Sequence, residues 1–242
     1  MMKFLKSKPW LFDFLKRCSR AVGKVNPFYL RLAGDPRLCR PLRFVQIGAN
    51  DGIVDDPIRE FIVRYQWRGI AIEPIPEIFA ALKPAYAGYP QVIPVNCAVS
   101  YGGDPALKLF FVKETALQRF PGFAAMISSS DREHLIRHLP SITADDIGEI
   151  AVPCRTVEAL VEDHKLGGVD FLHLDVEGHE ANILNNIDLE RLKPEFIFFE
   201  HRHLSEEHAA QIEDKLRRHG YVLERFPADT LAVRSPSKAP LA

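Results

Sequence analysis

Closely spaced cysteines and long apolar runs are both missing from this sequence of 242 residues. Its four cysteines, Cys18, Cys39, Cys97 and Cys154, form no C-x-x-C pair, so neither a zinc cage nor a dithiol redox site is indicated. No apolar run reaches the ~18 residues that suggest a membrane-spanning helix, and the N-terminus lacks the apolar core and small-residue cleavage site of a signal peptide. Because unpaired thiols are typical of reducing compartments, we predict a cytoplasmic protein.

A large net charge is also missing, since the chain carries only −1 in total. The two signs are unevenly distributed: residues 1–43 hold 11 Lys and Arg against 2 Asp, which leaves −10 on residues 44–242. The acidic body argues against nucleic acid as the main substrate, because phosphates are bound by cationic surfaces. The length fits one α/β domain with a small appendage.

The basic N-terminal segment has the spacing of an amphipathic helix over residues 7–22, followed by a proline-containing connector over residues 26–43. Three interpretations of the helix stay open: it lies on anionic lipid at the inner membrane face, it packs on its own domain, or it contacts a second copy of the chain. The predicted organisation is a basic helical leader and connector at 1–43, a domain at 44–234 and a tail at 235–242.

A glycine-rich turn follows the first predicted strand. Residues 44–47 form a buried-strand run, and Gly48, Ala49, Asn50, Asp51 and Gly52 come directly after it. Glycine adopts positive φ freely and asparagine tolerates it, so the turn can bend sharply and bring its backbone close to a ligand. A turn built for packing alone would have a similar composition, and that alternative stays open.

This turn is acidic and lacks the G-x-G-x-x-G fingerprint of dinucleotide-binding folds. Asp51, Asp55 and Asp56 would repel a pyrophosphate. The next helix is predicted to begin at Pro57 with Asp56 as its N-cap, away from the glycine turn where a phosphate would be favoured. A ligand with an ammonium and a sulfonium suits the acidic turn better, so we predict S-adenosylmethionine as the cofactor.

Two further strand ends add polar groups. The strand at residues 69–72 ends in Glu73-Pro74, about 20 residues after the glycine turn, where a carboxylate can accept hydrogen bonds from two ribose hydroxyls. The strand at residues 92–95 is followed by Asn96, whose amide can face an adenine edge. The alternatives are a strand-end or capping acid for Glu73 and a turn residue for Asn96.

The later part of the chain alternates strands with helices, which predicts a mostly parallel α/β sheet. Residues 113–150 have no clear periodicity apart from a helix near 131–139, and such an insertion often covers a substrate. The final hairpin makes the last strand antiparallel, an arrangement typical of methyltransferases. Further strands are predicted at 106–112, 169–174, 194–199, 220–226 and 230–234, and helices at 76–87, 156–164 and 205–219.

Acids and histidines recur at the carboxyl ends of these predicted strands, the edge where ligands bind in open α/β sheets. Asp175 and Glu177 follow one strand, and Glu200 and His201 follow another. Asp175, or His201 held by a neighbouring acid, is a candidate general base for an alcohol nucleophile. Metal binding by these residues and His203 is a rival interpretation, but they contain no compact spacing such as H-x-x-x-H, so no metal site is predicted.

Taken together, these motifs resemble the FkbM family of S-adenosylmethionine-dependent methyltransferases over about residues 44–234. The resemblance implies a class I methyltransferase fold, a doubly wound seven-stranded sheet, and O-methylation, often of sugars in glycans or glycosylated metabolites. It rests on Gln46 to Gly52, Ile72-Glu73-Pro74, Asn96-Cys97-Ala98, Leu174-Asp175-Val176-Glu177-Gly178, and Pro194 with Glu200.

The resemblance also implies roles for single residues. The glycine turn, residues 48–52, would contact the methionine part of the cofactor, and Glu73-Pro74 its ribose. Residues 96–98 would lie on the adenine side, while Asp175 and Glu177 would face the methyl acceptor. Two departures leave the acceptor end open: His173-Leu174 stands where family members often have a lysine, and Thr156-Val157-Glu158 replaces the usual Thr-Leu-Asp.

We therefore expect an O-methyltransferase that acts on a saccharide hydroxyl of a glycan or glycoconjugate. The predicted catalytic residues are Asp175, Glu177, Glu200 and His201. Two alternatives from other classes stay open: a nicotinamide-dependent oxidoreductase, and a non-catalytic module that binds S-adenosylmethionine or assembles with a partner.

Overall fold

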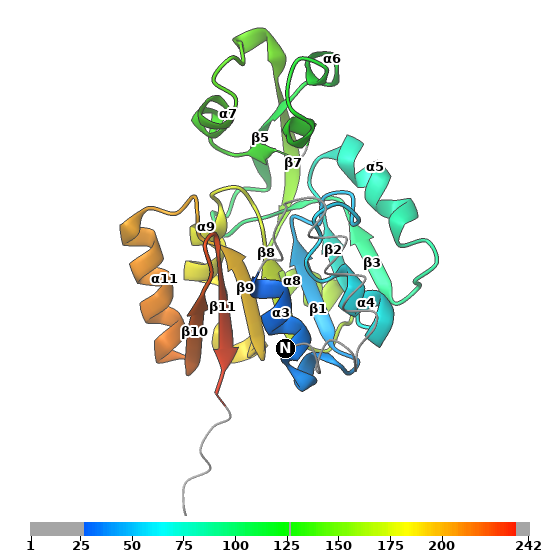
Figure 1. Cartoon of the computed structure of the whole chain (residues 1–242), viewed down its shortest axis with the longest axis vertical. Helices are drawn as coiled ribbons and strands as arrows, with labels where there is room; N and C mark the ends of the chain where they lie inside the picture. Colours follow the sequence, from blue (N-terminus) through cyan, green and yellow to red (C-terminus); the bar gives the residue numbers. More distant parts are fainter. Residues whose placement is uncertain (1–26, 126, 236–242) are drawn as a thin grey trace, which may run out of the picture.

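A seven-stranded sheet in the order β10-β11-β9-β8-β1-β2-β3 forms the centre of the protein (Figure 1). The computed structural model describes residues 27–125 and 127–235. All neighbouring strands are parallel except β11, which runs antiparallel to both β9 and β10. This confirms the predicted fold class. The strands are β1 (Arg43–Ile47), β2 (Arg68–Ile72), β3 (Val92–Val95), β8 (Phe171–Leu174), β9 (Phe196–Glu200), β10 (Tyr221–Arg225) and β11 (Asp229–Arg234).

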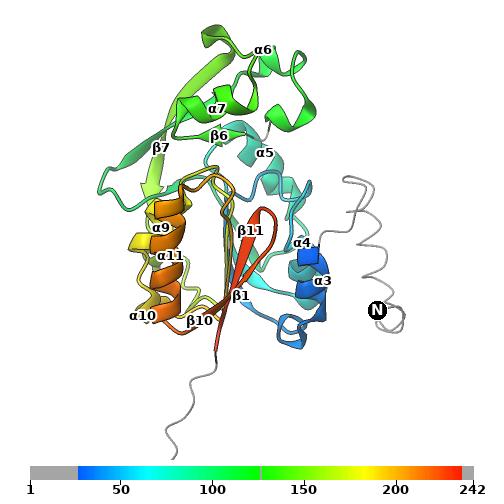
Figure 2. The same cartoon turned by 60° about the vertical axis from the view of Figure 1, so that its left-hand side comes forward.

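Helices cover both faces of this sheet (Figure 2). Successive strand residues point to opposite faces, so β1 directs Val45 and Ile47 to one core and Phe44 to the other. The first core is covered by α8 (Val157–Asp163), α9 (Glu180–Asn186), α10 (Leu189–Leu192) and α11 (Glu206–Arg218), and the second by α3 (Pro27–Gly34), the 3₁₀ turn η1 (Pro36–Leu38), α4 (Arg59–Tyr65) and α5 (Pro76–Ala85). No helix in the described part of the chain is both long and apolar enough to span a membrane.

The segment predicted as a connector contributes to the second core. Leu32, Ala33, Leu38 and Leu42 are buried there, and Arg31 of α3 donates two hydrogen bonds, of 2.7 and 2.8 Å, to the Glu224 carboxylate of β10. Residues 31–42 of this segment therefore pack against the main sheet. The helix predicted at 7–22 and the tail after residue 235 lie outside the described residues.

The start of α4 differs from its prediction by two residues. The helix begins at Arg59 and leaves Pro57 outside it. The Asp56 side chain still accepts hydrogen bonds from the backbone N–H groups of Ile58 and Arg59, both at 2.9 Å, so it satisfies helix N-terminal donors as a cap does. Thr156 and Ser205, the first residues of two predicted helices, are the N-caps of α8 and α11 and accept hydrogen bonds from Ala159 N and His208 N.

The insertion is larger than predicted and has a sheet of its own, in the order β4-β7-β5-β6. β5 (Ala106–Val112) pairs along its whole length with β7 (Ile147–Arg155), so the predicted strand at 106–112 belongs to the insertion. The remaining elements are β4 (Ala98–Val99), α6 (Glu114–Leu117), η2 (Gly122–Ala125), β6 (Ser128–Ser129), α7 (Arg132–His138) and η3 (Ala144–Asp146).

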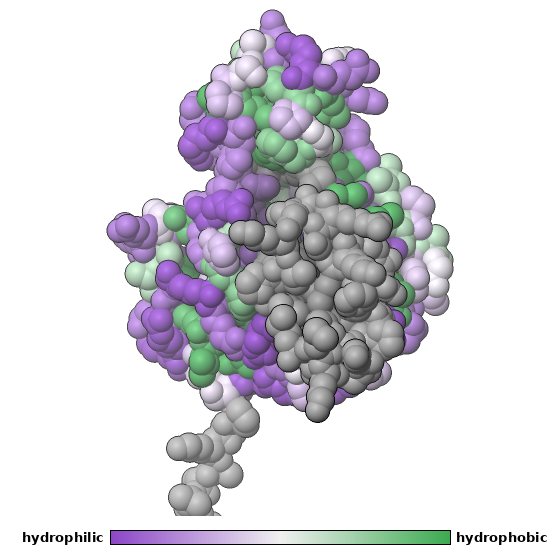
Figure 3. All heavy atoms as spheres, in the orientation of Figure 1, coloured by the Kyte–Doolittle hydropathy of each residue, from purple (hydrophilic) through white to green (hydrophobic). Residues whose placement is uncertain are grey.

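This second sheet stands above the carboxyl ends of the main-sheet strands (Figures 1 and 2). Val112, Leu135 and Ile147 belong to a separate apolar cluster under α7. Apolar side chains also gather on the visible face of the insertion (Figure 3). Phe123, in η2 of the insertion, is 46% exposed. The insertion thus has its own small core and forms a second wall above the edge where ligands bind.

Candidate functional site

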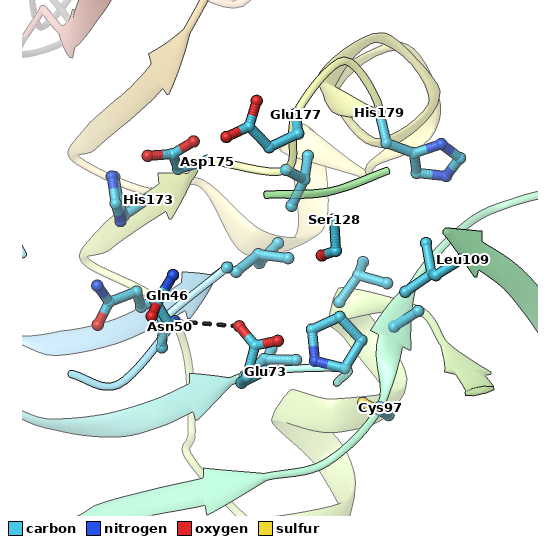
Figure 4. Close-up of a pocket in the computed structure, with 18 of the residues that line it drawn as sticks. Gln46, Asn50, Glu73, Cys97, Leu109, Ser128, His173, Asp175, Glu177 and His179 are labelled. Atoms are coloured by element: carbon cyan, nitrogen blue, oxygen red, sulfur yellow. Dashed lines mark hydrogen bonds between the residues drawn. The ribbon is translucent and has the colours of Figure 1, made fainter. Parts of the chain in front are cut away.

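A pocket opens between the carboxyl ends of β1, β2 and β8 and the second sheet. β1 and β8 are neighbours, and the chain continues from them toward opposite edges of the sheet, so the pocket lies at the topological switch point. In Figure 4, Glu73 lies across the pocket from Asp175 and Glu177. The main sheet contributes Gly48, Ala49, Asn50, Glu73 and Asp175 to the lining, and the second sheet Ala98, Leu107, Leu109 and Ser128.

The glycine turn is folded tightly against both neighbouring strands. Gly48 and Asn50 have φ angles of +80° and +50°, and a Cβ atom on Gly48 would lie 1.8 Å from the carbonyl oxygen of Asp175. Asp51 and Gly52 do not line the pocket. The Asp51 carboxylate instead accepts hydrogen bonds from Ile53 N and Val54 N, both at 2.8 Å, so it shapes the turn.

Glu73 is buried, with 4% of its surface exposed, and it joins two backbone segments at the pocket. Its carboxylate accepts hydrogen bonds from Asn50 N at 3.1 Å and from Ile75 N at 3.0 Å. Burial raises the pKa of this carboxyl to about 7. Each carboxylate oxygen keeps a further lone pair for a ligand donor.

The predicted adenine-side residues divide into two groups. Cys97 and Ala98 line the pocket, as does Pro74. Asn96 does not, because its side-chain amide donates to the carbonyl oxygens of Glu73 and Pro74 at 2.8 and 2.9 Å. Asn96 therefore holds the loop that presents Glu73.

Two buried polar residues that sequence reasoning did not place in the site, Gln46 and His173, also line the pocket. They are register partners on β1 and β8, with 1% and 3% of their surfaces exposed. Gln46 Oε1 and His173 Nδ1 have no hydrogen-bond partner within the described residues. Burial lowers the pKa of His173 to about 3, so its ring is neutral.

The unpartnered Gln46 oxygen provides a fit test for the predicted cofactor. A buried acceptor without a donor is costly, and an ammonium group carries three donors. Asp55, Asp56 and Glu73 add acidic groups to the lining. These residues fit a cationic ligand such as S-adenosylmethionine and disfavour a pyrophosphate.

Acidic side chains crowd the end of β8. Asp175 can be reached from the pocket, but desolvation by the surrounding protein and the charges of Glu200 and Glu177 raise its pKa well above the ordinary value. Burial, followed by the charge of Glu177, raises the pKa of Glu200 to about 8. Glu180 is fully buried and accepts hydrogen bonds from Val176 N and Gly178 N at 2.8 and 3.0 Å.

The four predicted catalytic residues are not all in the pocket. Asp175 and Glu177 line it, whereas Glu200 and His201 do not. Glu200 still lies within the acid cluster beside Asp175, but His201 Nδ1 is 2.9 Å from Thr230 Oγ1, away from the lining. His179 also lines the pocket, and its Nε2 lies 3.2 Å from the Ser100 hydroxyl oxygen.

The sequence matches a known protein family over most of its length. Residues 46–223 match the methyltransferase FkbM domain, and no curated protein matches the sequence. A crystal structure of methyltransferase FkbM from Methylobacillus flagellatus KT is 12% identical with a TM-score of 0.48, covering 79% of this chain and 43% of that one. This chain therefore spans less than half of that protein.

Two other solved structures are similar at the same level of identity. Aeropyrum pernix fibrillarin, in complex with natively bound S-adenosyl-L-methionine, is 14% identical with a TM-score of 0.40, covering 81% of this chain and 68% of that one. Precorrin-6y C5,15-methyltransferase from Geobacter metallireducens GS-15 is 13% identical with a TM-score of 0.44, covering 88% and 91%.

Proposed function

Because the chain belongs to the methyltransferase FkbM domain family, we propose that it methylates a hydroxyl oxygen of a saccharide in a glycan or glycoconjugate. Family and fold make it an S-adenosylmethionine-dependent methyltransferase. The oxygen nucleophile and the saccharide acceptor are the parts proposed here. The observation that carries the proposal is the meeting of Glu73 and Asp175, from two different strand ends, in one pocket.

The donor end of the pocket consists of the glycine turn, Glu73 and Gln46. When bound, S-adenosylmethionine supplies a methyl group that its sulfonium has already activated. The Glu73 carboxylate would accept hydrogen bonds from the ribose hydroxyls, and Gln46 Oε1 would accept one from the ammonium group. Neither residue takes part in the chemistry; both fix the position of the donor, which lowers the entropic cost of an in-line reaction.

The acceptor end has a proton acceptor and a mixed polar and apolar wall. A hydroxyl nucleophile has to lose its proton, and Asp175 takes it. Desolvation and the nearby carboxylates raise the pKa of Asp175, which strengthens it as a base. Ser128, Ser130 and Glu177 offer hydrogen-bonding groups beside Leu109, a combination that suits the hydroxyl and C–H surfaces of a sugar.

The test is methyl transfer by the full-length protein to a panel of free, nucleotide-linked and lipid-linked saccharides. Release of S-adenosylhomocysteine measures turnover, and NMR of the product locates the new methyl group. We expect an O-methyl sugar. Transfer to nitrogen or carbon, or binding of NAD in place of S-adenosylmethionine in calorimetry, would overturn the proposal.

Asp175→Asn separates catalysis from cofactor binding. Because the amide cannot take the proton, we expect kcat to fall by at least about 100-fold, the lower range for a general base, while the S-adenosylmethionine Kd stays unchanged. Asp214→Asn on α11, where the side chain is 68% exposed, is the matched control and should keep full activity. An Asp175→Asn enzyme with wild-type turnover would remove Asp175 from the mechanism.

A further inference from the structure

Three histidines meet where the insertion approaches the catalytic edge of the main sheet. His134 and His138 are four residues apart on α7, and His203 lies between β9 and α11. Their ring centroids are 4.3, 4.6 and 4.9 Å apart. One nitrogen from each ring lies within 4.8 Å of the others. Side chains from separate elements thus direct three potential metal ligands to one point.

Carboxylates complete the cluster. Glu177 Oε2 lies 2.8 Å from His134 Nε2 and 3.6 Å from His203 Nε2, and Glu200 Oε2 lies 3.3 Å from His203 Nε2. His134 is 1% exposed, so this is not a solvated surface group. The concentration of carboxylates here carries a repulsive cost that a bound cation would relieve.

We propose that His134, His138, His203 and Glu177 bind a divalent transition-metal ion of the Zn²⁺ type. Tetrahedral Zn²⁺ at 2.0–2.1 Å from its ligands places ligand atoms about 3.3 Å from one another. The distances from Glu177 to two of the imidazoles, 2.8 and 3.6 Å, lie on either side of that value. The three imidazole nitrogens lie within 4.8 Å of one another, so binding of the ion would draw these side chains closer together.

The donor set selects the class of metal. Three imidazoles and one carboxylate suit Zn²⁺ and its neighbours, whereas Mg²⁺ and Ca²⁺ require oxygen ligands. His138 Nδ1 donates to the carbonyl oxygen of His134 at 3.0 Å, which leaves Nε2 with the free lone pair. Such an outer hydrogen bond is typical of metal-binding histidines. The His134 Nε2 proton, now donated to Glu177, passes to solvent when the metal binds.

The inferred site shares Glu177 with the acceptor end of the pocket, but it does not depend on which acceptor is methylated. Its defining property is metal binding, which can be measured without any methyl transfer, so either proposal can fail alone. Glu177 is the one ligand that also lines the pocket. Through it, the ion would connect α7 of the insertion to the end of β8.

The experiment uses full-length protein made without a histidine tag, stripped with a chelator and titrated with Zn²⁺, Co²⁺ or Mg²⁺. We expect one Zn²⁺ per chain by elemental analysis, the visible absorption of four-coordinate Co²⁺, and no Mg²⁺ binding. Zn²⁺ should also raise the unfolding temperature, because it binds the folded state. Absence of stoichiometric Zn²⁺, or equal binding of Mg²⁺, would overturn the inference.

Two ligand variants and one control locate the site. His138→Ala and His203→Ala should each weaken Zn²⁺ binding by at least about tenfold, the lower range seen even for outer-shell changes. His208→Ala, at an exposed position on α11, should bind as the wild type does. Retained S-adenosylmethionine binding shows that each variant is folded. Wild-type Zn²⁺ affinity in both ligand variants would exclude this site.

Discussion

At the scale of single residues, Glu73 has the most sharply defined task. Its carboxylate accepts two backbone hydrogen bonds and lies in the pocket. We expect Glu73→Ala to weaken S-adenosylmethionine binding by at least about tenfold, since a lost hydrogen bond to a charged group is worth about 1.5–3 kcal/mol. Calorimetric titration measures the change.

The matched control is Glu77→Ala, in which an exposed carboxylate of the adjoining helix α5 is removed. It should leave the Kd unchanged. A Glu73→Ala protein that is folded and binds the cofactor normally would restrict Glu73 to holding the backbone.

Sequence reasoning found some site residues and missed others for physical reasons. Glu73 and Asp175 were predictable because parallel strands end at one edge of the sheet. Gln46 and His173 lie within buried strand runs, and no pattern shows that an atom there lacks a partner. The H-x-x-x-H spacing of His134 and His138 is visible in the sequence, but its meaning depends on His203, which only folding brings near.

At the scale of elements, the turn between β1 and α4 depends on Gly48, which lies against the backbone at the end of β8, the neighbouring strand in the sheet. Gly48 and Gly103 have nearly the same φ, +80° and +79°. A Cβ atom would meet the Asp175 carbonyl oxygen at Gly48 but nothing within 4 Å at Gly103. Alanine substitutions at these two glycines therefore separate the cost of backbone strain from the cost of steric crowding.

We expect Gly103→Ala to lower the free energy of unfolding by about 1–2 kcal/mol, the cost of a left-handed backbone. Gly48→Ala should cost more than about 3 kcal/mol, because β1 and β8 must also separate. Chemical denaturation measures both. Equal losses would show that the turn can relax without moving the strands.

Elements with a clear period were predictable, and those that depend on distant pairing were less so. The main-sheet strands and α11 follow from apolar spacing and caps. The second sheet joins residues 106–112 to residues 147–155, a contact that local periodicity does not reveal. As a result, the predicted insertion of residues 113–150 left out both the strand at 106–112 and the end of β7.

At the scale of the whole molecule, the buried acids make stability depend on pH. Burial raises the pKa of Glu73 and Glu180 to about 7 and that of Glu200 to about 8. In the unfolded chain a glutamate carboxyl has a pKa of about 4.3. Between pH 7 and 8.5 the folded state therefore binds more protons, and its stability falls as pH rises.

We expect the unfolding temperature of the metal-free, cofactor-free protein to fall by at least about 3 °C between pH 7 and 8.5. Scanning calorimetry in a chelating buffer measures this. Glu200→Gln should reduce the fall, because the amide cannot ionise, while Glu207→Gln at an exposed position on α11 should not. An unfolding temperature that rises over this range contradicts the account.

The two walls of the pocket belong to separate hydrogen-bonded sheets, β10-β11-β9-β8-β1-β2-β3 and β4-β7-β5-β6. A change of length or sequence between β4 and β7 consequently leaves the strand register beneath the donor end undisturbed. The acceptor wall can diverge, or be grafted from a related chain, as a module.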